Sequence, residues 1–294
     1  MKVLILGANG MAGHTITTYF LERGYNVTAY TSTPIKFHLL NGNNIIGNAF
    51  DTEKFKLALL SDNYDVVINC IGILNQNANN NPSKAIYLNS YLPHLIADTL
   101  KEHKTKLIQM STDCVFEGNK GPYYEDSLQD GRSFYDRTKA LGEVVDNKNL
   151  TFRNSIIGPD INVNGIGLFN WFMKQQGIIN GYIGAIWTGV TTLTLAKAME
   201  QAVKDNLTGL YNLVNNHSIS KYDLLCLFNK YFKNNELSII KSDIIKLDKS
   251  LINNRKDFSF IVPSYEQMIN EMKEWIDKHP NLYSFYNPNN VKRI

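Results

Sequence analysis

Short apolar runs alternate with amphipathic stretches along the first half of the chain. Each run is short enough for a buried strand, and each intervening stretch has the spacing of a helix. This alternation is typical of βαβ units, which build a parallel sheet covered by helices. It predicts a doubly wound α/β fold with strands at 2–6, 26–30, 43–47, 65–72, 106–111 and 150–157, and helices at 11–23, 52–61, 82–103 and 133–146.

The pattern changes after residue 160. Residues 165–190 are rich in glycine and aromatic residues, and we expect a loop between helical pieces that covers a substrate. Helical spacing at 191–204, followed by the run "GLYNLV", predicts a return to the sheet. The expected units are a dinucleotide-binding domain, 1–160 with 190–215, and a small mixed α/β substrate-binding region, 161–189 with 216–294, whose polar tail 287–294 is expected to be loose.

The composition is that of a soluble globular chain. Of the 294 residues, 44% are hydrophobic and 19% are charged, which is enough apolar material for a core. The net charge of +3 is not gathered into a basic tract, so no nucleic-acid partner is expected. No segment resembles a signal peptide or a membrane span, and Cys70, Cys114 and Cys226 lack metal-binding or disulfide spacing. We therefore expect a cytoplasmic protein without a metal or a membrane partner.

Three glycines, Gly7, Gly10 and Gly13, follow the first expected strand with the spacing GxxGxxG. Gly7 permits a tight turn, Gly10 lets the backbone approach a pyrophosphate, and Gly13 lets the helix lie against the strand. The free N–H groups at the helix start would face the anion. The position of this motif favours dinucleotide binding over its simpler interpretation, a turn followed by a small-residue helix contact.

The choice of dinucleotide depends on the end of the second strand. Sites for NAD usually place a carboxylate there for the ribose 2′-hydroxyl, but no acidic residue occurs between Glu22 and Asp51. The segment "TSTPIK" supplies small hydroxyls and Lys36, which suit a 2′-phosphate. NADP(H) is therefore the favoured cofactor and NAD(H) the second candidate. It is equally well supported that Lys36 is a solvated loop residue without a cofactor contact.

Tyr135 and Lys139 lie four residues apart in "FYDRTKALGE", so they share one face of an expected helix. Taken alone, such a pair is most simply a lysine stem packed along a ring. An ammonium one turn away also favours the phenolate, which predicts a tyrosine whose pKa is lowered toward neutrality.

The motifs around this pair resemble one family. "STDCVFEGNKGPYYEDS" (111–127), "YDRTK", "ALGE" and "RNSIIG" occur after GxxGxxG in the order found in extended short-chain dehydrogenases/reductases. The branch most resembled is dTDP-4-dehydrorhamnose reductase, with relatives that reduce UDP-linked 4-keto-6-deoxy-N-acetyl sugars. The resemblance covers residues 1 to about 214 and continues weakly at "VPSYEQMI". Cys114, where the reductases often carry Tyr, and Asp136, where a small residue is commoner, depart from the pattern.

The resemblance implies reduction of a nucleotide-linked 4-keto sugar, with no nucleic acid or metal involved, in a chain that could form a homodimer. Tyr135 would protonate the alkoxide that hydride transfer produces, Thr112 would hydrogen-bond the same oxygen, and Lys139 would also hold the nicotinamide ribose. The resemblance leaves dTDP and UDP open. The implied cofactor contacts, beyond the glycines, Lys36, Tyr135 and Lys139, are Asn9, Met11, Asp51, Cys70, Ile71, Gly72, Asn89 and Ser111.

The expected substrate contacts are Thr112, Asp113, Arg153, Tyr182 and Trp187. Arg153 would bring a positive charge near the site, and the two aromatic residues would form its wall. For Tyr182 and Trp187, packing in the core is about as well supported. Arg153 follows a strand and has a structural ion pair as its alternative.

The same residues bear on three other functions. The 4,6-dehydratases of this superfamily carry Glu after the Thr–Asp pair, whereas this chain has Cys114, so dehydration is disfavoured. A 4-epimerase usually keeps the acidic ribose ligand that is missing here. A noncatalytic NADP-binding subunit, resembling the regulatory subunit of methionine adenosyltransferase, is opposed but not excluded by the intact Thr112, Tyr135 and Lys139.

Overall fold

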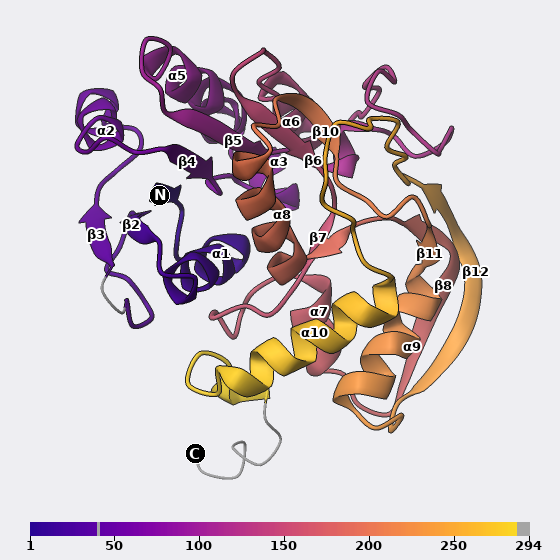
Figure 1. The fold of residues 1–294 in the computed structure, drawn as a ribbon. Coiled ribbons are helices and arrows are strands. Elements are labelled where there is room, and N and C mark those ends of the chain that lie inside the picture. Colours follow the sequence, from indigo (N-terminus) through magenta and orange to yellow (C-terminus); the bar gives the residue numbers. More distant parts are fainter. Residues whose placement is uncertain (40–41, 287–294) are drawn as a thin grey trace.

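The centre of the protein is a seven-stranded sheet in which every neighbouring pair is parallel (Figure 1). The computed structural model describes residues 1–39 and 42–286. The strand order β10-β6-β5-β4-β1-β2-β3 is that of a doubly wound sheet, which confirms the predicted fold class. The strands are β1 (Lys2–Leu6), β2 (Asn26–Thr31), β3 (Asn43–Ile46), β4 (Val66–Asn69), β5 (Lys106–Met110), β6 (Leu150–Arg153) and β10 (Gly209–Asn212).

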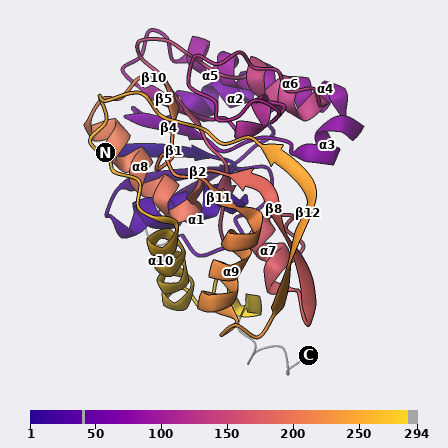
Figure 2. The same ribbon diagram turned by 90° about the vertical axis from the view of Figure 1, so that its right-hand side faces the viewer.

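Helices cover both faces of this sheet. Successive side chains of a strand point to opposite faces, and both faces carry apolar side chains that need to be covered. Val3 and Ile5 of β1 belong to one apolar cluster, and Leu4 and Leu6 belong to the other. Figure 2 shows the sheet between the two helical layers. One layer contains α1 (Met11–Glu22) and α8 (Thr192–Lys204), and the other contains α2 (Thr52–Leu59) and α5 (Leu92–Thr99).

A second sheet of three strands lies beside the first. Its central strand, β8 (Ile178–Trp187), runs parallel to β12 (Ser238–Asp248) and antiparallel to β11 (Ile219–Ser220). The loop expected at 165–190 was therefore a wrong prediction over ten of its residues. The glycines of β8 made this segment look like a loop in the sequence. Glycine is needed where α9 (Lys221–Phe232) packs on β8, because a Cβ on Gly181 would lie 2.7 Å from the Tyr222 ring.

Two other expected elements are interrupted. The helix expected at 82–103 consists of α4 (Pro82–Ala85), a π-helical turn η1 (Ile86–Tyr91) and α5. The strand expected at 150–157 divides into β6 and β7 (Ile156–Ile157), and β7 pairs with β9 (Val190–Thr191). The return of the chain to the sheet is confirmed by β10, which pairs with β6.

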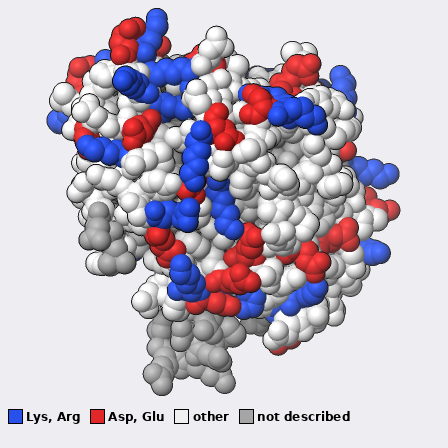
Figure 3. Space-filling model, in the orientation of Figure 1, with Lys and Arg blue, Asp and Glu red and all other residues white. Residues whose placement is uncertain are grey.

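The remaining elements are short or lie in the C-terminal part. They are α3 (Asn75–Asn80), η2 (Asp113–Val115), α6 (Phe134–Leu141), α7 (Leu168–Met173), α10 (Tyr265–Lys278) and η3 (Ser284–Tyr286). The tail 287–294, which the sequence predicts to be loose, lies outside the described residues. Over 1–39 and 42–286, no helix is long and apolar enough to cross a membrane. Acidic and basic side chains are interspersed on the face shown in Figure 3.

Candidate active site and cofactor cavity

A cavity of about 380 Å³ opens at the carboxyl ends of β1, β2, β3 and β4. This is where doubly wound sheets bind their ligands. The cavity brings together several residues expected at the cofactor, namely Gly7, Asn9, Gly10, Cys70, Ile71 and Gly72. It is also lined by Tyr30, Thr31, Ser32, Gly47, Asn48, Ala49, Phe50, Lys84 and Leu88.

The glycines of the GxxGxxG motif meet real steric demands. Gly7 has φ +78°, in the region that side chains disfavour. A Cβ on Gly13 would lie 2.2 Å from the carbonyl oxygen of Gly7, so only glycine lets α1 approach β1 this closely. Gly10 begins α1 without a side-chain cap, which leaves the first-turn N–H groups free for an anion. Met11 and Gly13 lie in this first turn but not on the cavity lining.

Asn9 organises the segment that follows β2. Its amide nitrogen donates to the carbonyl oxygens of Thr33 and Pro34 at 3.4 and 3.1 Å, and its Oδ1 accepts from the Lys36 backbone N–H at 3.0 Å. The Lys36 side chain is exposed and does not line the cavity. The lysine that lines it is Lys84, on α4, which the sequence analysis did not single out.

Two other residues expected at the cofactor, Asn89 and Asp51, form hydrogen bonds or ion pairs with other parts of the protein. The Asn89 side chain accepts from Ile73 N and donates to Ile73 O, both at 2.9 Å, and it reaches Thr138 Oγ1 at 3.2 Å. It therefore ties the loop after β4 to helix α6. Asp51 caps α2 and pairs with Lys54 at 2.9 Å, just beyond Phe50 on the cavity lining.

Helix α6 presents Tyr135 and Lys139. A capping box starts the helix: Ser133 Oγ accepts from Asp136 N at 3.0 Å, and Asp136 Oδ2 accepts from Ser133 N at 3.1 Å. This explains Asp136, one of the two departures from the family pattern. Tyr135 and Lys139 are each 7% exposed, so both groups of the expected pair are buried.

Thr112 and Asp113 lie at the start of η2, beyond the end of β5. The Thr112 hydroxyl donates to Asp113 Oδ1 at 3.1 Å and accepts from Cys114 N at 3.2 Å. Both residues also influence Tyr135: a hydrogen bond from the side chain of Thr112 lowers the pKa of Tyr135, and the charge of Asp113 raises it. The structure thus brings the predicted catalytic residues to one edge of the sheet.

The tyrosine pKa corrects the sequence-based expectation. Burial raises the pKa of Tyr135 above its ordinary value, the neighbouring Cys114 adds to the rise, and the Thr112 hydroxyl acts against it. The Lys139 ammonium donates to the Met110 carbonyl at 2.7 Å, and burial lowers the pKa of Lys139 to about 8. The loss of solvation is thus the largest influence on the Tyr135 pKa, and it favours the protonated phenol.

Arg153 adopts the structural pairing that the sequence left open. It is 1% exposed, and its Nε and Nη2 donate to the two carboxylate oxygens of Glu143 at 2.9 and 2.7 Å. Its Nη1 reaches the carbonyl oxygens of Tyr124 and Glu125 at 3.4 and 3.3 Å. Ser111 Oγ donates to the same carboxylate at 2.5 Å. Four hydrogen bonds thus hold the Arg153 guanidinium within the protein.

The two aromatic candidates differ in their surroundings. Trp187 is 3% exposed at the end of β8, where its ring contacts Tyr265 at 5.6 Å between centroids. The Lys221 Nζ lies 4.9 Å from the centre of the Trp187 ring. Tyr182 is half-buried in the middle of β8, opposite Ser242 of β12.

Lys221 is not among the residues predicted for the site, although its position at a helix start gave one indication. It is the first residue of α9, after the Ser220 cap, where the helix dipole disfavours a positive charge. A lysine at that position calls for a compensating partner. Burial lowers the pKa of Lys221 to about 8, and the Asp113 carboxylate of the candidate active site acts against that lowering.

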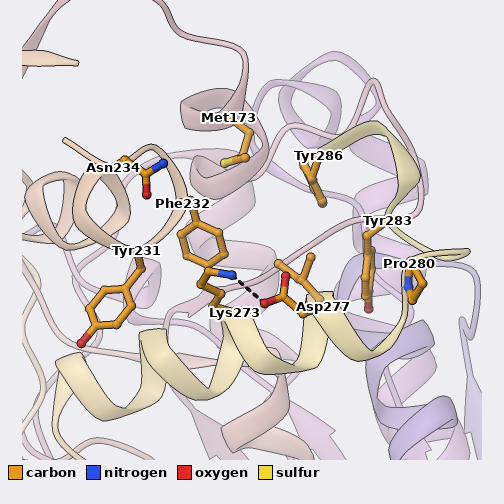
Figure 4. A pocket seen from close by; sticks show the side chains of 10 residues that line it. Met173, Tyr231, Phe232, Asn234, Lys273, Asp277, Pro280, Tyr283 and Tyr286 are labelled. Carbon is orange, nitrogen blue, oxygen red and sulfur yellow. Dashed lines mark hydrogen bonds and ion pairs between the residues drawn. The ribbon is translucent and has the colours of Figure 1, made fainter. Parts of the chain in front are cut away.

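A second cavity, of about 340 Å³, lies elsewhere, between α7, α9 and α10 (Figure 4). Lys273 and Asp277 form an ion pair of 2.6 Å beside it. Its other lining residues are Met173, Tyr231, Phe232, Asn234, Ile276, Pro280, Tyr283 and Tyr286, and none of the residues expected at the active site is among them.

The fold and the Tyr–Lys helix beside the glycine-rich turn define an extended short-chain dehydrogenase/reductase. The sequence profile of the RmlD substrate binding domain matches residues 1–156, more than half of the chain. The protein belongs to this family.

Two curated relatives show how far the similarity extends. dTDP-4-dehydrorhamnose reductase of Streptomyces griseus is 32% identical over 142 residues, which are 48% of this chain and 43% of that protein. The chain thus spans less than half of that relative's length. Methionine adenosyltransferase 2 subunit beta of Xenopus laevis is 23% identical over 245 residues, covering 76% of this chain and 70% of the relative.

Solved structures agree on the fold. A dTDP-4-dehydrorhamnose reductase from Bacillus anthracis, in complex with NADP, superposes with a TM-score of 0.77 at 18% identity, over 94% of this chain and 99% of that one. A dTDP-glucose 4,6-dehydratase from the same organism, in complex with NAD, gives 0.74 at 14% identity, over 98% and 100%. At these identities the likeness shows the fold alone.

Proposed function

We propose that the protein uses NADPH to reduce the 4-keto group of a nucleotide-linked 4-keto-6-deoxyhexose. The observation that carries this proposal is the meeting of Thr112, Tyr135 and Lys139 at the sheet edge that also holds the dinucleotide cavity. Relatives named as dTDP-4-dehydrorhamnose reductases and a probable glycan biosynthesis reductase support it. The substrate is dTDP-4-dehydrorhamnose or a UDP-2-acetamido-2,6-dideoxy-hexulose, and the pathway is the synthesis of surface polysaccharide precursors in the cytoplasm.

The residues present fit a dinucleotide cofactor. The Gly7 turn and the uncapped start of α1 suit a pyrophosphate, and Ser32 and Lys84 on the cavity lining suit a 2′-phosphate. NADP(H) is therefore preferred, with NAD(H) as the second candidate. When bound, the cofactor supplies the hydride.

The residues of the chain then deliver one proton to the substrate. A protonated phenol at Tyr135 gives its proton to the alkoxide oxygen at C4, which is a strong enough base to take it. The Thr112 hydroxyl hydrogen-bonds that oxygen, and Lys139 holds the ribose. Burial raises the pKa of Cys114 to about 12, so this residue stays a thiol and is a poor base for dehydration.

The second candidate is a noncatalytic partner subunit. The Xenopus laevis subunit beta aligns over a larger share of this chain than the reductases do, although at lower identity. Such a protein would bind NADP(H) and leave every 4-keto sugar unchanged. Reduction is preferred because the acid–base residues of the reductases are all present.

One assay separates these functions. Oxidation of NADPH is measured with dTDP- and UDP-linked 4-keto-6-deoxyhexoses, the latter with and without a 2-acetamido group, and products are weighed by mass spectrometry. A gain of two hydrogens supports the reductase, with Tyr135→Phe as the inactive control. Loss of water from a 6-hydroxy precursor would instead indicate a dehydratase. Cofactor binding without any product favours the noncatalytic subunit.

A further inference from the structure

Two lysines from the C-terminal part of the chain reach the candidate active site. Lys221 begins α9, and Lys249 follows directly after β12. Burial raises the pKa of Asp113, and the charges of both lysines act against that rise. Lys249 also packs against the segment that follows η2, since a Cβ on Gly118 would lie 2.7 Å from Lys249 Cγ. We call Lys221 and Lys249 the lysine pair; both act on Asp113, the residue next to Thr112.

The lysine pair has no hydrogen-bond acceptor of its own in the described part of the chain. Both side chains are half-buried, and neither forms a hydrogen bond or an ion pair with a described residue. The Lys221 ammonium instead lies over the Trp187 ring, and burial lowers the pKa of Lys221 to about 8. An ammonium removed from water without an acceptor is unfavourable, so this arrangement favours a ligand that brings acceptors.

Two other cations near this edge, Arg153 and Lys139, are already engaged. Arg153 is paired with Glu143, and Lys139 donates to the Met110 carbonyl. A nucleotide-linked sugar carries its negative charge on the diphosphate, one sugar ring away from the C4 atom that Tyr135 protonates. The lysine pair, by contrast, supplies positive charge at Asp113.

Building on the proposed function, we propose that the lysine pair binds the diphosphate of the nucleotide-sugar substrate. Each ammonium donates charge-assisted hydrogen bonds to phosphate oxygens. The Trp187 ring contacts the Lys221 ammonium and keeps its charge near the ligand. The lysine pair thus supplies the charge that the sequence analysis assigned to Arg153.

The test measures binding of dTDP and UDP by titration calorimetry, with no reduction required. The variants are Lys221→Met, Lys249→Met, the double variant and Lys221→Arg. Lys230→Met is the matched control, since Lys230 lies on the same helix over a Tyr231 ring but is exposed and paired with Glu266. NADPH binding of each variant, followed by fluorescence, verifies that it is folded.

Each single Met variant should weaken nucleotide binding by about tenfold, which corresponds to one lost charge-assisted hydrogen bond. The double variant should lose more, Lys221→Arg should keep most of the affinity, and Lys230→Met should match the wild type. A dissociation constant within twofold of wild type in the double variant overturns the proposal, as does a wild type that binds neither nucleotide. Lysine-dependent binding without sugar reduction would support the lysine pair and refute the proposed reductase.

Discussion

Replacing Arg153 tests whether this residue is structural. Arg153→Met removes a guanidinium that is 1% exposed and leaves the carboxylate of Glu143, 4% exposed at its side chain, without its cation. Breaking a buried ion pair on one side typically costs about 3–5 kcal/mol. With a urea dependence near 3 kcal/mol per molar for a chain of this size, the unfolding midpoint should fall by about 1–2 M.

The assay is urea unfolding followed by circular dichroism and tryptophan fluorescence. The double variant Arg153→Met/Glu143→Leu should recover part of the loss, because no unpaired charge then stays buried. Arg132→Met is the surface control: Arg132 pairs with Glu117 at 2.8 Å but is 75% exposed, so its loss should cost less than about 1 kcal/mol. Wild-type stability in Arg153→Met, together with a raised KM for the sugar nucleotide, would refute this reasoning and restore Arg153 as a substrate ligand.

Four further predictions concern the cofactor, the acid–base residues and pH. Tyr135→Phe should lower kcat by about 10²–10⁴ with little change in NADPH affinity, whereas Lys139→Met should impair both, as measured by steady-state kinetics and cofactor titration. Gly13→Ala places a Cβ 2.2 Å from Gly7 O and should abolish NADPH binding in a fluorescence titration; normal affinity would contradict the close packing. Lys84→Glu should weaken NADPH binding more than Lys36→Glu does, since only Lys84 lines the cavity. Burial lowers the pKa of His14 to about 4, so the contribution of neutral His14 to the free energy of unfolding, about 3 kcal/mol, is complete above pH 6.5 and is lost as the pH falls toward 4. In His14→Gln, the free energy of unfolding measured by urea denaturation should depend less on pH between 6.5 and 4 than in the wild type. An unchanged pH dependence would contradict this prediction.

The sequence was sufficient to predict the central sheet because its inner strands β1, β4 and β5 are buried on both faces and consist mostly of apolar residues. It also located the glycine turn, since Gly7 and Gly13 meet local steric demands that a motif can express. Strand β8 was hidden, because Gly181 satisfies a contact with Tyr222, forty-one residues further along the chain. Such a contact leaves no local pattern.

The candidate site was predictable where one segment carries several of its residues. Tyr135 and Lys139 share a helix, and Thr112 and Asp113 follow one strand. The environment of Lys221 was not predictable, since its neighbours Asp113 and Trp187 come from distant elements. The pKa of Tyr135 was misjudged for a related reason: spacing along a helix gives the distance to Lys139 but not the depth of burial.

The π-helical turn Ile86–Tyr91 is a place where the loss of a single residue would change the structure around it. Asn89 lies within this turn and contacts both the loop after β4 and helix α6. Deleting one residue from the turn would restore ordinary α-helical geometry and rotate one side of it by about 100° relative to the other. Asn89 would then lose Ile73 and Thr138 together. In homologues, therefore, the length of this segment should be fixed more strictly than the identity of most of its side chains.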